Sequence, residues 1–202
     1  MSREVISPAD GSAESVGSTT TRRSDRRPGQ TIRKVLDAGL EELRKSSYAN
    51  LTMRAVAQRA GVSPASAYTY FSSKSALVAA VYLRLLRELP LHTDVNDTTK
   101  TRVSATMRDM ALVVADEPEL TAGCGAALMA DDPAVIPLRA EIAAEVSRRI
   151  GAALGPGWPR PVLSTLQMTF AGALMAARFL TYPEIAGQLD EAVNLILGAS
   201  VA

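Results

Sequence analysis

LTMRAVAQRAGVSPASAYTYFSSKSAL, residues 51–77, contains the signals of two short helices joined by a tight turn. Thr52 is a candidate N-cap, because a threonine hydroxyl accepts a backbone N–H of the first helical turn. Gly61 suits the positive φ at which helices commonly end. Ser63 is a second candidate N-cap, and Pro64 follows at the first helical position, where its missing N–H is not needed. The stretch predicts a helix–turn–helix unit over residues 52–71.

The second of these helices, residues 64–71, has an unusual composition. It holds Tyr68, Tyr70 and Phe71, whereas the whole chain has only three Phe, one Trp and five Tyr. The two tyrosines lie about 200° apart around a helix, so we expect one to pack against the core and the other to offer its hydroxyl to a phosphate. The second helix of such a unit lies in the major groove of DNA, although the unit also serves as a packing element in which both tyrosines are core residues.

Positive charge is concentrated around this stretch. Residues 22–74 carry eleven basic and four acidic residues, a net charge of +7, whereas residues 75–202 carry ten basic and fourteen acidic residues, a net charge of −4. A cationic segment of this kind is typical of a nucleic-acid footprint, although a basic stretch is also often a solvated surface. Residues 1–27 lack apolar periodicity and end in four arginines, so we expect a disordered arm that either contacts DNA or is a soluble tail.

The composition of the whole chain indicates its fold class. The 202 residues are 47% hydrophobic and 4% aromatic, and the apolar residues recur mainly at helical spacing, which predicts an all-α protein. The single Cys124 excludes an intramolecular disulfide, and the sequence has neither a signal peptide nor an apolar run of about 18 residues. We therefore expect a soluble, cytoplasmic protein with no membrane partner.

Turn signals and periodicity divide the chain into parts. An N-terminal group of helices is predicted at 31–45, from Thr52 to Gly61, at 64–71, and from after Ser72 to about Glu88, and a second group near 98–115, 118–130, 134–154, 161–181 and 184–199. We expect a disordered basic arm at 1–27, a helix-turn-helix DNA-binding domain at 28–75, and an effector-binding and dimerisation domain at 76–202.

The N-terminal group resembles the DNA-binding segment of the TetR family of bacterial transcriptional regulators. The resemblance covers residues 29 to about 80 and rests on a hydrophobic–Thr–x–Arg entry, an Ala–x–x–x–Gly–Val turn, Tyr–x–x–Phe at the end of the second helix, and a lysine after a small-residue break. One departure is Tyr70, where many members have His; a phenol can still donate to a phosphate. The resemblance implies that DNA is contacted by Thr52, Arg54, Ser63, Pro64, Ala65, Ser66, Tyr68, Tyr70 and Lys74.

The same resemblance implies a helical second domain that forms the dimer and holds an effector pocket. Residues 161–181 are apolar nearly all round, and Gly172 with Ala176 permits a close backbone approach. Residues 184–199 carry an apolar stripe of their own, so two helices from each subunit can build a four-helix interface. The alternative is an ordinary buried helix in a monomer.

The C-terminal group is also rich in methionine, which adapts to varied apolar shapes. We therefore predict an apolar effector, with the alternative that these residues are ordinary core. The candidate lining residues are Met107, Met110, Val114, Leu128, Met129, Met168, Phe170 and Met175.

The most concrete interpretation is a dimeric, sequence-specific repressor that leaves a palindromic DNA operator when a small effector shifts the linking helix near 75–88. The rival is a helical small-molecule-binding or catalytic protein with an incidental helix-turn-helix. Neither a nucleophile–base pair nor a Gly-rich phosphate loop is evident, and the single His92 and Cys124 do not make a metal site. We expect no enzyme activity, cofactor or metal.

Overall fold

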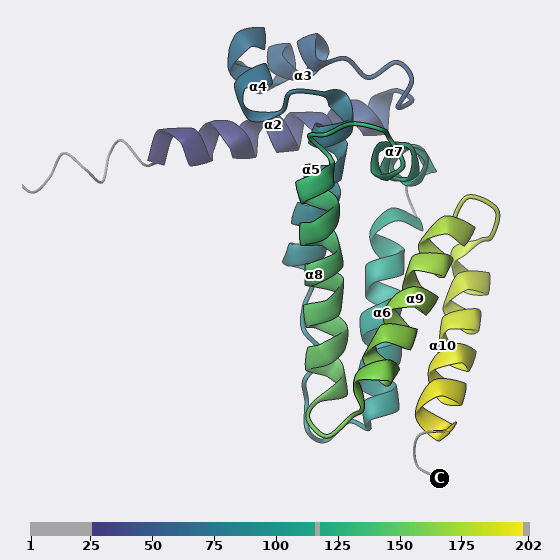
Figure 1. The fold of residues 1–202 in the computed structure, drawn as a ribbon. Coiled ribbons are helices and arrows are strands. Elements are labelled where there is room, and N and C mark those ends of the chain that lie inside the picture. Colours follow the sequence, from purple (N-terminus) through teal and green to yellow (C-terminus); the bar gives the residue numbers. More distant parts are fainter. Residues whose placement is uncertain (1–25, 116–117, 200–202) are drawn as a thin grey trace, which may run out of the picture.

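The structure, a computed structural model of the chain, describes residues 26–115 and 118–199. These residues form nine α-helices and no strand, which confirms the all-α prediction (Figure 1). The helices are α2 (Arg26–Lys45), α3 (Met53–Ala60), α4 (Pro64–Tyr70), α5 (Lys74–Glu88), α6 (Thr99–Ala115), α7 (Pro118–Leu128), α8 (Ile136–Leu154), α9 (Arg160–Ala176) and α10 (Tyr182–Ala199).

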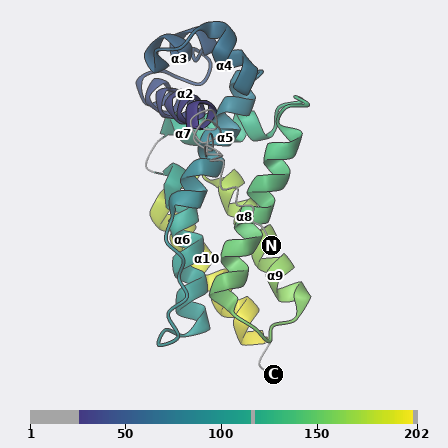
Figure 2. The same cartoon turned by 90° about the vertical axis from the view of Figure 1, so that its left-hand side faces the viewer.

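The helices form a head and a bundle. Figure 1 shows α2, α3 and α4 at one end of the molecule, while α5, α6, α8, α9 and α10 extend away from that end. The shorter α7 lies between the two parts and packs against both α2 and α5. Figure 2, turned by 90°, again has α3 and α4 at the tip. The tip is therefore free to meet a partner without contact from the bundle.

Helix α5 connects the head to the bundle. Gly39 of α2 permits a close approach, because a Cβ at that position would lie only 3.1 Å from Leu77 Cδ2 of α5. About two turns further along α5, Arg84 Nη1 donates to Asp37 Oδ1 of α2 at 2.5 Å. The rest of α5 packs on α7 and α8. The expected domain boundary at residue 75 thus falls in the first turn of a helix that belongs to both parts.

A buried arginine fixes α8 to the far end of α5. The Arg149 side chain is 2% exposed, and its Nε donates to Glu145 Oε1 at 2.7 Å. Its Nη1 and Nη2 donate to the carbonyls of Pro90 and Leu89, each at 3.0 Å. Leu89 is the C-cap of α5, so the guanidinium satisfies carbonyls that a helix end leaves without partners. The arrangement compensates the burial of both charges.

Two predicted boundaries differ from the structure by more than two residues, whereas the others agree within two. Helix α2 begins at Arg26, five residues before the predicted Thr31, because Pro28 is tolerated in a first helical turn. Residues 26 and 27 are therefore helical and do not belong to an arm, and the rest of the predicted arm lies outside the described residues.

The second difference is the junction of α9 and α10. We predicted a helix to residue 181 and a new one from 184, but α9 ends at Ala176 and α10 begins at Tyr182. The Glu184 carboxylate accepts the Thr181 N–H at 2.8 Å and the Thr181 hydroxyl at 2.7 Å. This is one half of a capping box, for which Thr–x–x–Glu is the sequence signal.

Among the described residues, no helix combines the length and the apolar character needed to cross a membrane. The bundle instead encloses a continuous apolar core that extends into the head.

Candidate functional site

The turn between α3 and α4 is built by the residues that the sequence singled out. Thr52 Oγ1 accepts the Ala55 N–H at 3.2 Å, and Ser63 Oγ accepts the Ser66 N–H at 3.1 Å. Gly61 ends α3 with φ 66° and ψ 34°, a left-handed conformation that favours glycine. The Val62 N–H then donates to the Ala57 carbonyl at 3.0 Å. The two N-caps and the glycine at the end of α3 are therefore as predicted.

Helix α4 turns one face to solvent. Pro64, Ala65, Tyr68 and Thr69 are exposed and follow one another at helical spacing, whereas Ala67 is fully buried. The side chain of Tyr68 is 51% exposed, and Tyr70 is half-buried against the core. Tyr70 therefore packs in the head and Tyr68 is exposed, as expected of one core and one surface tyrosine, whereas the phosphate contacts of both stay predictions. Thr69 was missed by the sequence reasoning, although its spacing of four from Ala65 could have placed it on this face.

The two capping residues, Thr52 and Ser63, are exposed at the N-terminal ends of α3 and α4. Each accepts a backbone N–H and keeps its own hydrogen, with which a hydroxyl can donate to a phosphate. Arg54 is exposed on the first turn of α3 and forms no ion pair with the residues described. By contrast, Arg59 at the other end of α3 donates to Glu42 Oε1 of α2 at 2.5 Å. Arg54 is thus the arginine of α3 that is available to an external anion.

Lys74 lies in the first turn of α5 and is engaged within the protein. Its Nζ donates to the carbonyls of Tyr48 at 3.1 Å and Ala49 at 3.3 Å. The same atom lies 4.6 Å from the centroid of the Tyr48 ring. An ammonium has three hydrogens, so a phosphate contact at Lys74 would use the one that remains. Tertiary contacts thus give this lysine a structural role that its sequence position did not reveal.

The comparisons with known proteins agree with this geometry. Residues 35–81 match the model of a family described as bacterial regulatory proteins, tetR family. Over 206 residues, covering 99% of this chain and 96% of the relative, the chain is 48% identical to uncharacterized HTH-type transcriptional regulators of Mycobacterium bovis and Mycobacterium tuberculosis. The chain belongs to the TetR family of bacterial regulatory proteins.

Solved structures show the same fold. A TetR transcriptional regulator from Rhodococcus sp. RHA1 superposes with a TM-score of 0.74 at 19% identity, covering 87% of this chain and 98% of that one. A transcriptional regulator from Rhodococcus sp. Rha1 gives a TM-score of 0.59 at 20% identity with the same coverage. As a TetR-family member the protein is a DNA-binding transcriptional regulator and not an enzyme, and the rival interpretation as a catalytic protein is wrong.

A second candidate site is a cavity of about 360 Å³ in the bundle. Helix α5 contributes Tyr82, α7 contributes Leu128, and α8 and α9 contribute the remaining walls. Three of the eight residues predicted to contact an effector, Leu128, Met168 and Phe170, line this cavity. Outside its wall lie the buried Met107, Met110 and Val114 and the exposed Met129 and Met175.

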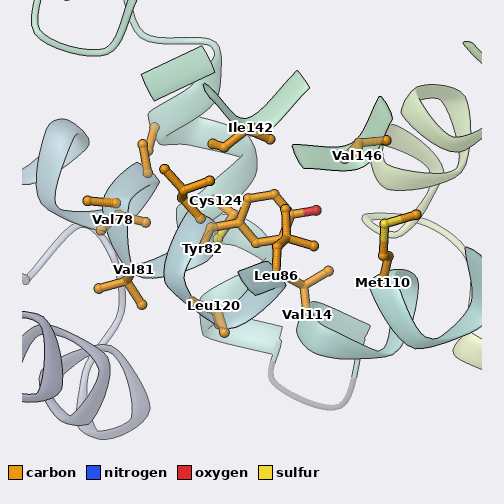
Figure 3. Packing of buried hydrophobic residues seen from close by; sticks show 14 of the residues in the cluster. Val78, Val81, Tyr82, Leu86, Met110, Val114, Leu120, Cys124, Ile142 and Val146 are labelled. Carbon is orange, nitrogen blue, oxygen red and sulfur yellow. The ribbon is translucent and has the colours of Figure 1, made fainter. Parts of the chain in front are cut away.

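The wall of this cavity includes polar residues that the sequence reasoning did not select. Arg139 and Gln167 line it, the former exposed and the latter half-buried. Tyr82 is fully buried, and burial raises the pKa of its hydroxyl. Figure 3 shows the Tyr82 hydroxyl on the side of the ring toward Val146 and Met110, with Cys124 behind the ring. Cys124 is buried, as the sequence suggested, and burial raises the pKa of its thiol. The thiol is therefore held in its unreactive neutral form.

Proposed function

We propose that this TetR-family regulator is a repressor that binds a palindromic operator as a homodimer and leaves the operator when a small, largely apolar effector enters the cavity. The observation that carries the DNA contact is the exposed face of α4, which is held at the tip of the molecule by the caps of Thr52 and Ser63. A single helix of seven residues makes few base contacts, so two heads on successive major-groove faces are needed for specificity.

The α9–α10 pair supports dimerisation. On α9, Met168, Gly172 and Met175 are exposed at spacings of four and three, which places them on one stripe. Phe179, four residues beyond Met175 and 86% exposed, continues this apolar surface past the helix end. Contiguous apolar surface of this kind marks interaction sites in soluble proteins.

The groove between the same two helices fits a second copy. It has a volume of about 290 Å³ and is lined from α9 by Thr169, Gly172, Ala173 and Ala176, and from α10 by Ile185, Gln188, Leu189 and Ala192. Both sets repeat every three or four residues, so they face each other along parallel seams. The small residues leave room for a helix of a partner subunit, which would complete a four-helix interface.

Introduction of a charge on this face tests the dimer. Leu195 of α10 is 74% exposed, and Leu195→Glu would place a carboxylate inside the proposed interface. We expect this variant to dissociate at protein concentrations at which the wild type is dimeric by light scattering. Val95, 89% exposed and outside this pair of helices, offers Val95→Glu as the matched control. Equal association by both variants and the wild type would rule out this interface.

Selection of bound sites from a random DNA pool tests the partner and its symmetry together. We expect an inverted repeat whose half-site centres lie one helical turn apart or a multiple of it, about 34–36 Å per turn. Enrichment of a single asymmetric half-site would contradict the proposed dimer on a palindrome. No enrichment at all would contradict the assignment of α4 as the reading helix.

Helix α7 is the proposed route from the cavity to the head. Its Leu128 lines the cavity, whereas a Cβ at Gly123 would lie 3.3 Å from Leu43 Cδ2 and 3.4 Å from Tyr48 Cδ2 of the head. Such tight packing means that a shift of α7 cannot be absorbed locally. A movement at its Leu128 end would therefore displace the head.

A hydrogen bond forms a second link between the same parts. Ser73, the N-cap of α5, donates to Asp132 Oδ2 in the α7–α8 connection at 2.5 Å.

Both links connect the cavity to the head, so any compound that binds in the cavity should weaken operator binding. Fluorescence anisotropy of labelled operator DNA measures this. Equal operator affinities of the free and the liganded protein would refute release, since a ligand shifts an equilibrium only by its differential affinity.

A further inference from the structure

The cavity opens to solvent along the seam between α8 and α9. These helices are antiparallel, because residues 155–159 join them at the end of the bundle away from the head (Figure 1). The inner wall is buried and apolar and includes Ile142, Val146 and Phe170. The rim is exposed and includes Ala143, Met168 and Ala171. A molecule from solvent therefore meets an apolar surface here without a rearrangement of the core.

The two ends of this opening differ in charge. Arg139, near the N-terminus of α8, is exposed and is the charged residue of the described cavity wall, at the end toward the head. At the other end the wall includes Val146 of α8 and the neutral Gln167 of α9. The rise of α8 from Arg139 to Val146 is about 10 Å. An elongated ligand in the opening therefore has a cation beside one of its ends only.

Arg139 has no carboxylate partner among the described residues, although α8 carries two carboxylates. Glu141 is engaged by Arg87 of α5, whose Nη2 donates to Glu141 Oε2 at 2.9 Å. Glu145 is engaged by the other two arginines of α8, which donate to its Oε1 at 2.6 and 2.7 Å. Both acidic residues of the helix are thus paired elsewhere, and the guanidinium at the cavity is available to an external anion.

The segment before α8 does not neutralise this end of the cavity. Asp131 and Asp132 precede the helix, but neither forms an ion pair with Arg139; Asp132 accepts hydrogen bonds from Ser73 and from the Ala134 N–H. The first turn of α8 has no acidic residue, and its N-cap makes no side-chain hydrogen bond. Because negative charge is favourable near a helix N-terminus, the helix end and the guanidinium favour the same sign of ligand charge.

We propose that the effector is an amphipathic carboxylate, whose carboxylate pairs with Arg139 and whose hydrocarbon body covers the apolar inner wall of the cavity. This inference rests on the proposed role of the cavity as the effector site. A ligand in the opening removes water from the guanidinium, and a charge that loses water without a partner costs free energy. A neutral or cationic ligand leaves that cost in place, whereas a carboxylate accepts two parallel hydrogen bonds from a guanidinium.

The size of the site limits the ligand further. A single guanidinium matches a single negative charge, which favours a monocarboxylate over a doubly charged phosphate. The volume of about 360 Å³ lies near the lower limit of ligand pockets, which span about 300–1,000 Å³. The hydrocarbon body is therefore short, of a length near the rise of about 10 Å along α8.

Three probes with the same hydrocarbon chain test the class: octanoate, 1-octanol and octylamine, which at pH 7 are an anion, a neutral molecule and a cation. Binding is followed by NMR of the full-length protein with ¹³C-labelled methionine methyl groups. Met168 lines the cavity, whereas Met129 is 72% exposed and outside its wall, so Met129 reports nonspecific binding.

We expect octanoate to shift the Met168 signal and to bind about fivefold more tightly than 1-octanol, the effect of one ion pair at a partly exposed site. Octylamine should bind more weakly than either. In Arg139→Gln the preference for octanoate over 1-octanol should disappear, while 1-octanol binds as before. Arg160→Gln is the matched control, because Arg160 is exposed at the start of α9 and outside the cavity wall; it should keep the preference.

Salt supplies a second measurement on the wild type alone. Raising the salt concentration from about 0.05 M to about 0.5 M screens a partly exposed ion pair, so octanoate should lose most of its advantage while 1-octanol does not weaken. An advantage of octanoate that persists at high salt would show that it does not come from the guanidinium.

The opposite outcomes separate the two proposals. Equal binding of octanoate and 1-octanol to the wild type, an unchanged preference in Arg139→Gln, or an equal loss in Arg160→Gln would overturn the inference and leave the cavity as an effector site. Failure of all three probes to shift Met168 at millimolar concentration would overturn both proposals.

Discussion

Replacement of Lys74 should lower the stability of the protein, whereas replacement of Arg54 should affect DNA binding alone. Lys74→Met keeps the length of the side chain but removes the ammonium that donates to the carbonyls of Tyr48 and Ala49. Hydrogen bonds to charged groups contribute about 1.5–3 kcal/mol when well buried. The half-buried position of Lys74 reduces each of the two to about 1 kcal/mol, and the Tyr48 ring at 4.6 Å adds about 0.5–1 kcal/mol. We expect a loss of about 2.5–3 kcal/mol in the free energy of unfolding.

The measurement is urea denaturation at a fixed protein concentration, because dimerisation would make the apparent stability concentration-dependent. In thermal unfolding the same loss lowers Tm by about 5–10 °C for a protein of this size. Arg54→Gln is the matched control, since Arg54 is exposed and forms no ion pair among the described residues. An unfolding free energy for Lys74→Met within about 0.5 kcal/mol of the wild type, the range of ordinary surface substitutions, would refute the reasoning.

Salt dependence of DNA binding completes the comparison. Each phosphate contact contributes about 0.9 to the slope of log affinity against log salt. Arg54→Gln should reduce that slope by about one unit without a change in stability. Lys74→Met should lower the free energy of unfolding. It should also reduce the salt slope, because the one ammonium hydrogen that the protein leaves unused could no longer contact a phosphate. A slope unchanged by Lys74→Met would show that this lysine acts only within the protein.

Three further predictions concern the packing of the head and bundle. Gly61→Ala should destabilise the protein by about 1–2 kcal/mol, because the left-handed backbone and not a steric contact opposes a side chain there. Gly61→Asn should cost less, since asparagine tolerates this conformation better. Equal unfolding of the wild type and Gly61→Ala would contradict this. Arg149→Ala should cost about 3–5 kcal/mol in urea denaturation by leaving the buried Glu145 with fewer partners, and a loss below 1 kcal/mol would contradict the structural role of this pair. The hydrogen bond from Ser73, followed by the Ala134 N–H, lowers the pKa of Asp132 below its ordinary value of 3.8, so its stabilisation is present above that pH and is lost as the pH falls through the lower folded-state value. Acid titration below about pH 4 should therefore destabilise the wild type more than Asp132→Asn, and parallel curves would exclude the linkage.

The sequence was sufficient for features that depend on neighbours along the chain. Thr52, Gly61 and Ser63 act through backbone groups within four residues, so caps and turns could be located from residue types alone. The missed junction at Thr181 and Glu184 belongs to the same class, because its capping box was legible in the sequence. Helical periodicity likewise indicated the apolar side of each helix.

Only the tertiary structure decided what each side of a helix meets. Met110 and Met175 occupy similar apolar contexts in the sequence, yet one is fully buried and the other is 39% exposed. The engagement of Lys74 with residues 48 and 49, and of Ser73 with Asp132, joins segments 25 to 59 positions apart. Periodicity specifies a direction around one helix axis, but a cavity, or a hydrogen bond between distant segments, requires several axes to be placed together. The sequence by itself therefore determined the helices and the helix–turn–helix unit, whereas the packing of α5, α7, α8 and α9 determined the cavity between them.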